Sequence, residues 1–169
     1  MRFALDYPDY VKSMSLIDAL SELDATFHWM ADAWLELLRE GDMAKLFRAA
    51  VPAIYSNFFL EKNEKALRER EAMMSKVPKD FIESLIRLIN NTMTNANPQT
   101  TEELTKIKCP VFLAVGENDQ LTPVKFSRLM LAKMPHAEFV VVPDCGHTTV
   151  YEKPGVVNTL TLGFVSKHS

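Results

Sequence analysis

The sequence is poor in cysteine and has no excess of positive charge. Its two cysteines, Cys109 and Cys145, each lie beside a predicted strand and lack the spacing of metal ligands, so neither a disulfide framework nor a zinc site is predicted. Its 19 Lys and Arg are spread among 22 Asp and Glu, which gives a formal net charge of −3. Because no basic stripe is available to neutralise a phosphate backbone, nucleic acid is not expected as a partner.

Long hydrophobic runs are absent as well. The first residues contain no apolar core of a secretory signal, and no run approaches the roughly 20 residues that span a bilayer. We therefore expect a soluble, cytoplasmic protein with no membrane partner, and we expect no cofactor and no metal. Over 169 residues the hydrophobic content is 47%, which is enough to bury the core of one domain, or of one domain with a small appendage.

The hydrophobic pattern of the first two thirds changes from strand to helix. Residues 1–10 read as the last turns of a helix whose beginning is absent, and residues 11–19 are an apolar stretch of strand length. From about residue 26 to residue 104 the apolar spacing is helical. One helix stops at Gly41, three more are predicted at 43–54, 61–75 and 79–93, and a polar loop containing Asn90, Asn91, Asn95, Asn97 and Pro98 follows.

The last third alternates between strands and helices. Residues 111–115 form a continuous apolar run that ends at Gly116, which is typical of a strand covered on both faces. A helix at 123–133, a strand at 138–142 and a helix at 154–167 are predicted after it. The pattern therefore predicts an α/β fold with parallel strands and a helical insertion.

Two loops, each after a predicted strand, carry the residues that could do chemistry. The first is residues 116–123 (GENDQLTP) and the second is residues 144–154 (DCGHTTVYEKP). In open α/β sheets, ligands and reactive groups collect at the carboxyl ends of the strands. Taken singly, Asp119 reads as a helix cap and His147 as a turn residue. As an ordered pair on consecutive strands, they favour a catalytic interpretation.

These loops, as G-x-x-D-x-x-x-P and then G-H-x-x-x-x-E-x-P, resemble the end of the α/β-hydrolase family, in its cap-bearing esterase, lactonase and haloperoxidase-like branch. The resemblance implies the C-terminal part of that fold, with about three parallel strands and a helical cap insertion. Residues 1–25 and 105–169 would form a partial hydrolase core, and residues 26–104 the cap. By the same resemblance, Asp119 is the acid and His147 the base of a Ser–Asp–His triad.

The nucleophile of such a triad is missing. A serine on the strained turn after a strand needs small neighbours, as in G-x-S-x-G, and none of the nine serines has them. By the resemblance, Met1 lies a few residues beyond that serine. Cys145 is a poor substitute because it shares a tight loop with the base. Asp18 remains an alternative acid, although a loop cap is the simpler interpretation, and Glu152 and Pro154 are expected to orient the last helix and the histidine loop.

Two functions are compatible with these residues. The first is an ester, lactone or related acyl hydrolase that acts on a small-molecule acyl substrate in its intact form and is inactive as this chain alone. The alternative is a truncated, non-catalytic module for dimerisation or small-ligand binding. In either case, the exposed edge of the 11–19 strand is expected to recruit a second copy or a complementing N-terminal half. Aromatic side chains of the insertion read either as a pocket lining or as plain core: Trp29, Trp34, Phe58 and Phe59.

Overall fold

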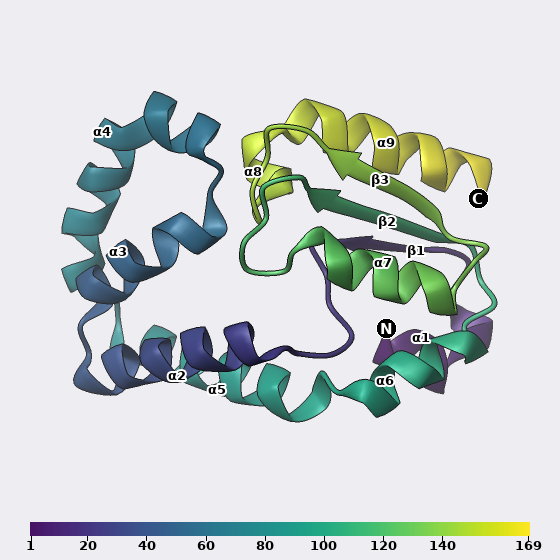
Figure 1. Ribbon diagram of the computed structural model, residues 1–169, viewed down its shortest axis with the longest axis horizontal. Helices are drawn as coiled ribbons and strands as arrows, with labels where there is room; N and C mark the ends of the chain where they lie inside the picture. The colour runs from purple at the N-terminus through teal and green to yellow at the C-terminus, as the bar shows by residue number, and fades with distance from the viewer.

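Three parallel strands form the sheet in the computed structural model, which describes all residues 1–169 (Figure 1). They lie in the order β1-β2-β3, with Met14 opposite Val111 and Phe112 opposite Glu138. This confirms the predicted α/β fold with parallel strands. The strands are β1 (Met14–Ile17), β2 (Val111–Gly116) and β3 (Glu138–Val142).

The edge strand β1 is shorter than the predicted 11–19 segment. Residues before Met14 make no ladder with β2, and Asp18 adopts a left-handed conformation with φ of 49°, which turns the chain away from the strand direction. The strands β2 and β3 and the helix at 154–167 have the predicted positions. Each is marked locally by a change in the hydrophobic period and by a Gly or Pro at one boundary.

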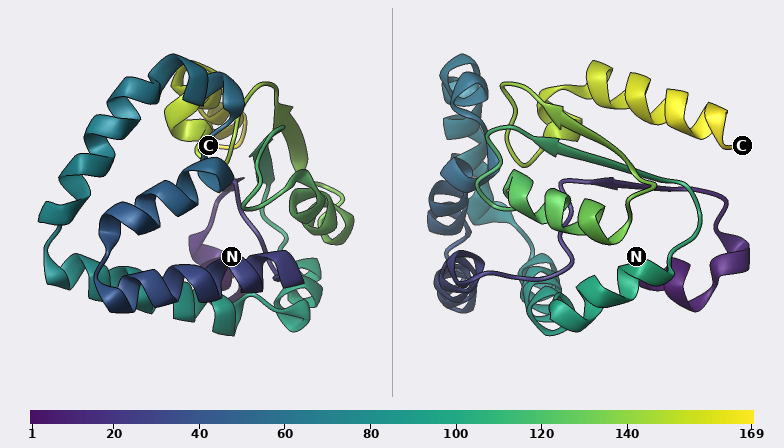
Figure 2. Two further views of the ribbon diagram at one scale, coloured as in Figure 1. Left: turned by 60° about the vertical axis from the view of Figure 1, so that its left-hand side comes forward. Right: turned by 45° about the vertical axis from the view of Figure 1, so that its right-hand side comes forward.

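Helices cover both faces of the sheet. Every residue of β2 is buried, because α7 (Val124–Lys133) lies on one face and α9 (Pro154–Lys167) on the other (Figure 2). On the first face, Leu113 belongs to one buried cluster with Met130 of α7. On the second, the ring of Phe112 stacks on that of Phe164 with centroids 5.6 Å apart. The alternation of side chains along a strand therefore divides the core into two layers.

The N-terminal segment packs at the amino ends of the strands. It consists of α1 (Arg2–Asp6) and the 3₁₀ turn η1 (Pro8–Tyr10). Met1 and Leu5 are partly buried against the cluster of the α7 face, whereas the rings of Phe3, Tyr7 and Tyr10 are exposed. No helix of the structure is both long enough and apolar enough to cross a membrane.

A second group of helices lies beyond the ends to which the strand arrows point (Figure 1). Their own buried cluster is centred on Leu35, Leu38, Met43 and Leu46, with apolar side chains of α5 packed against it. The members of this group, all between β1 and β2, are α2 (Ala25–Glu40), α3 (Met43–Ile54), α4 (Asn57–Met73), η2 (Met74–Lys76) and α5 (Lys79–Asn95). The chain then returns to β2 through α6 (Pro98–Glu103) and η3 (Leu104–Lys106), which contact α7 of the sheet layer (Figure 1).

Helix boundaries in this group follow capping residues. Gly41, with φ of 75°, ends α2, and the side chain of Asp42 accepts from the Lys45 amide to open α3. Ser56 caps α4 by accepting from the Phe59 amide, so α4 begins four residues before the predicted position 61. Serine at a helix start is a sequence signal that the hydrophobic spacing alone does not show.

The prediction of a polar loop around residues 90–98 is wrong for residues 90–95. Helix α5 continues to Asn95, whose side-chain amide donates to the main-chain oxygen and to Oδ1 of Asn91 one turn earlier. Pro98 then opens a further helix, α6, behind a cap from Asn97. Asparagines one turn apart on an exposed face can satisfy one another, which removes their usual preference for a loop.

The loops after β2 and β3 touch each other at their glycines. A Cβ atom on Gly116 would lie 2.1 Å from the carbonyl oxygen of Gly146, and one on Gly146 would lie 2.5 Å from the Ser56 amide nitrogen. Main-chain bonds join the same loops, since the Asn118 amide donates to the Cys145 carbonyl at 2.8 Å. The two loops can meet because Gly116 carries no side chain, and the bare Gly146 in the same way leaves room for the main chain between α3 and α4.

This contact predicts opposite effects for two Gly→Ala substitutions. Gly116→Ala forces apart two main-chain segments and is expected to lower the free energy of unfolding by about 3 kcal/mol. Gly163→Ala, inside α9 where a Cβ meets nothing within 4 Å, is expected to raise it by about 0.5–1 kcal/mol. Urea unfolding followed by circular dichroism measures both, and equal stability of the two variants would contradict the contact.

Candidate active site

Asp119 is held by the amides of its own loop. Its Oδ1 accepts from the amides of Leu121 at 2.9 Å and Thr122 at 2.7 Å, and its Oδ2 accepts from the Thr122 hydroxyl at 2.8 Å. The side chain is fully buried. Because all three partners are donors, they match an ionised carboxylate, and the turn that follows β2 fixes its direction.

His147 lies against this carboxylate. Its Nδ1 is 3.0 Å from Oδ2 of Asp119, so the structure brings the two predicted site residues together. An ionised carboxylate can only accept, which places a proton on Nδ1 and leaves the lone pair on Nε2. Nε2 has no hydrogen-bond partner, and the ring, 24% exposed, lines a cavity. The imidazole therefore has the tautomer of a base that faces the cavity.

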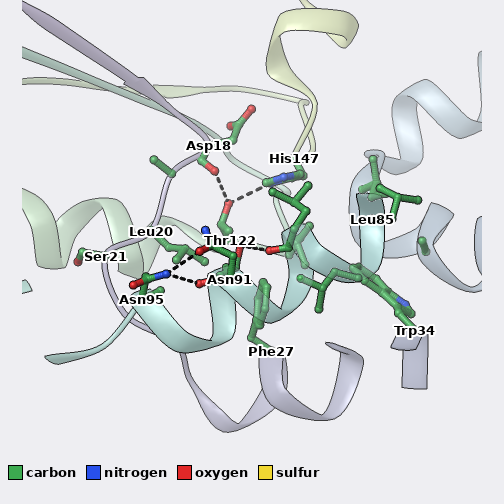
Figure 3. Close-up of a pocket in the computed structure, with 18 of the residues that line it drawn as sticks. Asp18, Leu20, Ser21, Phe27, Trp34, Leu85, Asn91, Asn95, Thr122 and His147 are labelled. Atoms are coloured by element: carbon green, nitrogen blue, oxygen red, sulfur yellow. Dashed lines mark hydrogen bonds between the residues drawn. The ribbon is translucent and has the colours of Figure 1, made fainter. Parts of the chain in front are cut away.

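Thr122 is a member of this cluster that the sequence interpretation missed. Its hydroxyl lies 3.0 Å from His147 Nδ1 and 3.0 Å from the main-chain oxygen of Asp18 (Figure 3). A hydroxyl has one proton, so Thr122 donates to the oxygen of Asp18 or to Asp119 and turns its lone pairs toward the Nδ1 proton. A threonine just before a helix-opening proline reads as an ordinary cap, which is why only the fold reveals its contact.

The loop that carries His147 is tied to the insertion helices. Glu152 accepts from the Gly146 amide at 3.2 Å and from the amide and hydroxyl of Ser56, at 3.0 and 2.5 Å. The His147 amide itself donates to the Ile54 carbonyl at 2.8 Å. The prediction that Glu152 orients the histidine loop is thus confirmed, and the α3–α4 junction is its unexpected second anchor.

Asp18, the alternative acid, makes no hydrogen bond to His147. Its carboxylate instead accepts from the Gly116 amide and from the amide and hydroxyl of Thr149. Burial raises the pKa of Asp18 to about 6, while the two Thr149 bonds act in the opposite direction. The contact to the imidazole therefore belongs to Asp119, and Asp18 has a separate role.

Cys145 does not have the properties of a nucleophile. Its side chain is buried, and burial raises the pKa of the thiol to about 12. A thiol with such a pKa carries almost no thiolate at neutral pH. This agrees with its interpretation as a small core residue.

A cavity of about 1140 Å³ lies between the site and the insertion helices. His147, Thr122 and Asp18 form part of one wall (Figure 3). Of the four aromatic residues read either as pocket lining or as core, Trp34 lines the cavity, whereas Trp29 is 80% exposed and Phe58 is 48% exposed and fit neither interpretation. The other apolar lining residues include Phe27, Met43, Leu46, Phe47, Ile54 and Leu85.

Comparison with known proteins extends the likeness to nearly the whole chain. Residues 3–160 match the model of the alpha/beta hydrolase family. The putative carbamate hydrolase RutD of Caulobacter sp. strain K31 is 24% identical over 172 residues, a match that covers 98% of this chain and 60% of RutD. MGS-M2, an alpha/beta hydrolase enzyme from a Medee basin deep-sea metagenome library, superposes with a TM-score of 0.90 at 26% identity, covering 98% of this chain and 60% of MGS-M2.

A solved structure with lower identity shows the same fold. The enol-lactonase from Burkholderia xenovorans LB400 is 16% identical, with a TM-score of 0.77 over 97% of this chain and 60% of the lactonase. The chain thus spans about 60% of the length of each of these relatives.

The Asp119–His147 contact predicts a change of tautomer in Asp119→Asn. The substituted amide keeps an oxygen for the loop amides and turns its NH₂ group toward Nδ1, which then becomes an acceptor and moves the imidazole proton to Nε2. The ¹⁵N chemical shifts of the His147 ring report this directly. In Asp144→Asn, which alters an exposed neighbour without a side-chain bond to the ring, the tautomer should stay as in the parent; the same Nδ1–H form in Asp119→Asn would disprove the contact.

The buried thiol predicts unequal alkylation of the two cysteines. At pH 8, iodoacetamide should leave Cys145 unmodified in the folded protein, because burial both shields the sulfur and raises its pKa to about 12. Cys109 is only partly buried and should react first. Mass spectrometry of tryptic peptides measures both, with urea-unfolded protein as the control in which both react. Modification of Cys145 ahead of Cys109 in the folded state would contradict its burial.

Proposed function

The chain belongs to the alpha/beta hydrolase family, and on that premise we propose that it provides the acid and the base of a serine hydrolase for esters, lactones or related acyl compounds. Asp119 orients the imidazole, and His147 takes the proton of the nucleophile and returns it to the leaving group. The nucleophilic serine comes from outside these 169 residues. Residues 26–104 act as the helical cap over the substrate, and residues 1–25 with 105–169 belong to the hydrolase core.

The observation that carries this proposal is the 3.0 Å contact between His147 Nδ1 and the buried Asp119 Oδ2, with Nε2 left without a partner beside the cavity. A serine hydroxyl is a weak nucleophile until a neighbouring imidazole accepts its proton, and a buried carboxylate stabilises the imidazolium that results.

The cavity supports a small acyl substrate. Its volume of about 1140 Å³ and its apolar wall from the insertion helices suit the carbon skeleton of such a compound. Two similar proteins are named for their substrates, as a putative carbamate hydrolase and an enol-lactonase. Carbamates and lactones both contain a carbonyl carbon bonded to a heteroatom leaving group. That bond type is the substrate class that we propose.

Three hydroxyls around the site do not replace the nucleophile. The Ser56 hydroxyl donates to Glu152, that of Ser21 pairs with Thr101, and that of Thr122 lies on the Nδ1 side of the ring. None is hydrogen-bonded to Nε2, so in this chain alone the imidazole offers general-base assistance of about 10²-fold at best.

The second candidate, a non-catalytic module that binds a small ligand or a second copy, is favoured by two observations: the large cavity and the unpaired edge of β1. It differs from the first in that His147 would be dispensable. Ligand binding or dimerisation would then be unchanged in His147→Ala.

The decisive test uses a fusion protein in which the part of MGS-M2 that this chain does not cover is joined ahead of Met1. The experiment measures whether a fluorophosphonate probe labels this fusion. We expect the isolated chain to remain unlabelled and the folded fusion to react, with nitrophenyl acetate turnover that falls about 10²- to 10⁴-fold in His147→Ala. The same fusion with Asp144→Asn serves as the matched control. A folded fusion that labels and turns over equally well without His147 would reject the proposed role.

A further inference from the structure

Asp18 connects the end of β1 with the end of β2 and with the loops that carry Asp119 and His147. It directly follows Ile17, the last residue of β1, and its amide donates to the Ala114 carbonyl of β2 at 2.9 Å. Its own carbonyl accepts from the Thr122 hydroxyl at 3.0 Å, in the loop that carries Asp119. With φ of 49°, its backbone has left the strand conformation, and its side chain turns back over the end of the sheet.

The carboxylate of Asp18 binds both site loops at once. Oδ1 accepts from the Gly116 amide at 3.2 Å, at the start of the Asp119 loop. Oδ2 accepts from the amide of Thr149 at 3.0 Å and from its hydroxyl at 2.7 Å, two residues after His147. One side chain on the edge strand therefore bridges the two segments from which Asp119 and His147 project.

We propose that Asp18 is a positioning residue: its ionised carboxylate holds the His147 loop in register with the Asp119 loop, and protonation of that carboxylate weakens this hold. The catalytic meaning of this device rests on the proposed function, whereas the positioning itself does not. Asp18 makes no contact with the imidazole and is not itself an acid or base of the reaction.

The hydrogen-bond chemistry explains why protonation matters. All three partners are donors, and the two main-chain amides cannot reverse their direction. A proton on Oδ1 would face the Gly116 amide, and a proton on Oδ2 would leave only the Thr149 hydroxyl able to turn and accept. Protonation therefore either breaks the Gly116 bond or leaves the bonds to Gly116 and Thr149 in a weaker, neutral form, because hydrogen bonds to a charged group are the stronger ones.

The pH at which this change occurs lies in an accessible range. Burial raises the pKa of Asp18 to about 6, with the Thr149 bonds and the charge of His147 lowering it and the charge of Asp119 raising it. The titratable groups that face Asp18 are thus Asp119 on one loop and His147 on the other, together with Cys145, whose raised pKa of about 12 keeps it neutral.

The sign of the effect differs between stability and site order. Because the folded pKa, about 6, exceeds the ordinary value of 3.8, the folded state binds the proton more tightly. The stability from Asp18 is present below about pH 4 and is lost as pH rises through 6. The site follows the opposite course, since the bonds to Gly116 and Thr149 reach their full strength only above about pH 6.

Amide hydrogen exchange in Asp18→Asn tests the positioning. The substitution keeps the shape but replaces one acceptor oxygen with a donor, so we expect the Gly116 or the Thr149 amide to exchange about tenfold faster or more. We also expect the ring ¹⁵N shifts of His147 to move toward a mixture of tautomers. Asp144→Asn is the matched control, in which neither should change. Unchanged exchange and an unchanged tautomer in folded Asp18→Asn would overturn the proposal.

A pH titration of the unsubstituted chain tests the proposal without depending on whether a variant folds. The amide proton shifts of Gly116 and Thr149 should titrate together with a midpoint near pH 6. In His147→Ala the two amides should still titrate together, with a midpoint displaced to higher pH, because the charge of His147 no longer lowers the pKa of Asp18. Flat shifts of both amides between pH 4 and pH 8 would overturn the proposal.

These readouts separate the positioning from the hydrolase proposal. Both can succeed while the fusion with MGS-M2 fails to hydrolyse an ester, and in that case Asp18 still positions the loop although the proposed function is wrong. If the fusion is active, part of the fall of its turnover rate at low pH should have a midpoint near pH 6, and Asp18→Asn should remove that part of the pH dependence.

Discussion

The contact between the loops after β2 and β3 is the constraint on which the site depends. Gly116 and Gly146 approach so closely that a single Cβ atom would overlap a main-chain oxygen. Parallel strands alone bring the two loops to the same edge of the sheet, but they leave the relative height and direction of Asp119 and His147 undetermined. The bare backbone contact fixes both, and the bonds from Asn118 to Cys145 and from Glu117 to Val142 complete it.

Around this contact, three carboxylates have different functions because they face different partners. Asp119 is fully buried among loop donors and directs its second oxygen at the imidazole. Asp18 bridges the two loops from the edge strand, and Glu152 attaches the histidine loop to Ser56 of the insertion. The cavity is thus bounded by the end of the sheet and by the insertion helices. The loop that carries His147 connects these two walls, so the shape of the cavity and the orientation of His147 depend on the same contacts.

The sequence was sufficient for features that are encoded locally. The period change at β2, the bounds of β3, α3 and α9, and the two loops with Asp119 and His147 could all be predicted, because each depends on neighbouring residues. The start of α4 and the path of residues 90–98 were mistaken, since capping by Ser56 and pairing between Asn91 and Asn95 override hydrophobic spacing. The roles of Thr122 and Asp18 were out of reach, because the Asp18–Thr149 bond joins residues 131 positions apart.

In this structure His147 is a base whose direction and protonation are set before any substrate arrives. Neutron diffraction from a crystal of the chain exchanged into D₂O tests this most directly, because it locates the proton positions in the site. We expect a deuteron on His147 Nδ1 directed at Asp119 Oδ2, and no deuteron on Nε2 facing the cavity, at a pH where the imidazole is neutral. A deuteron on Nε2 alone, or an imidazole turned away from Asp119, would contradict the account.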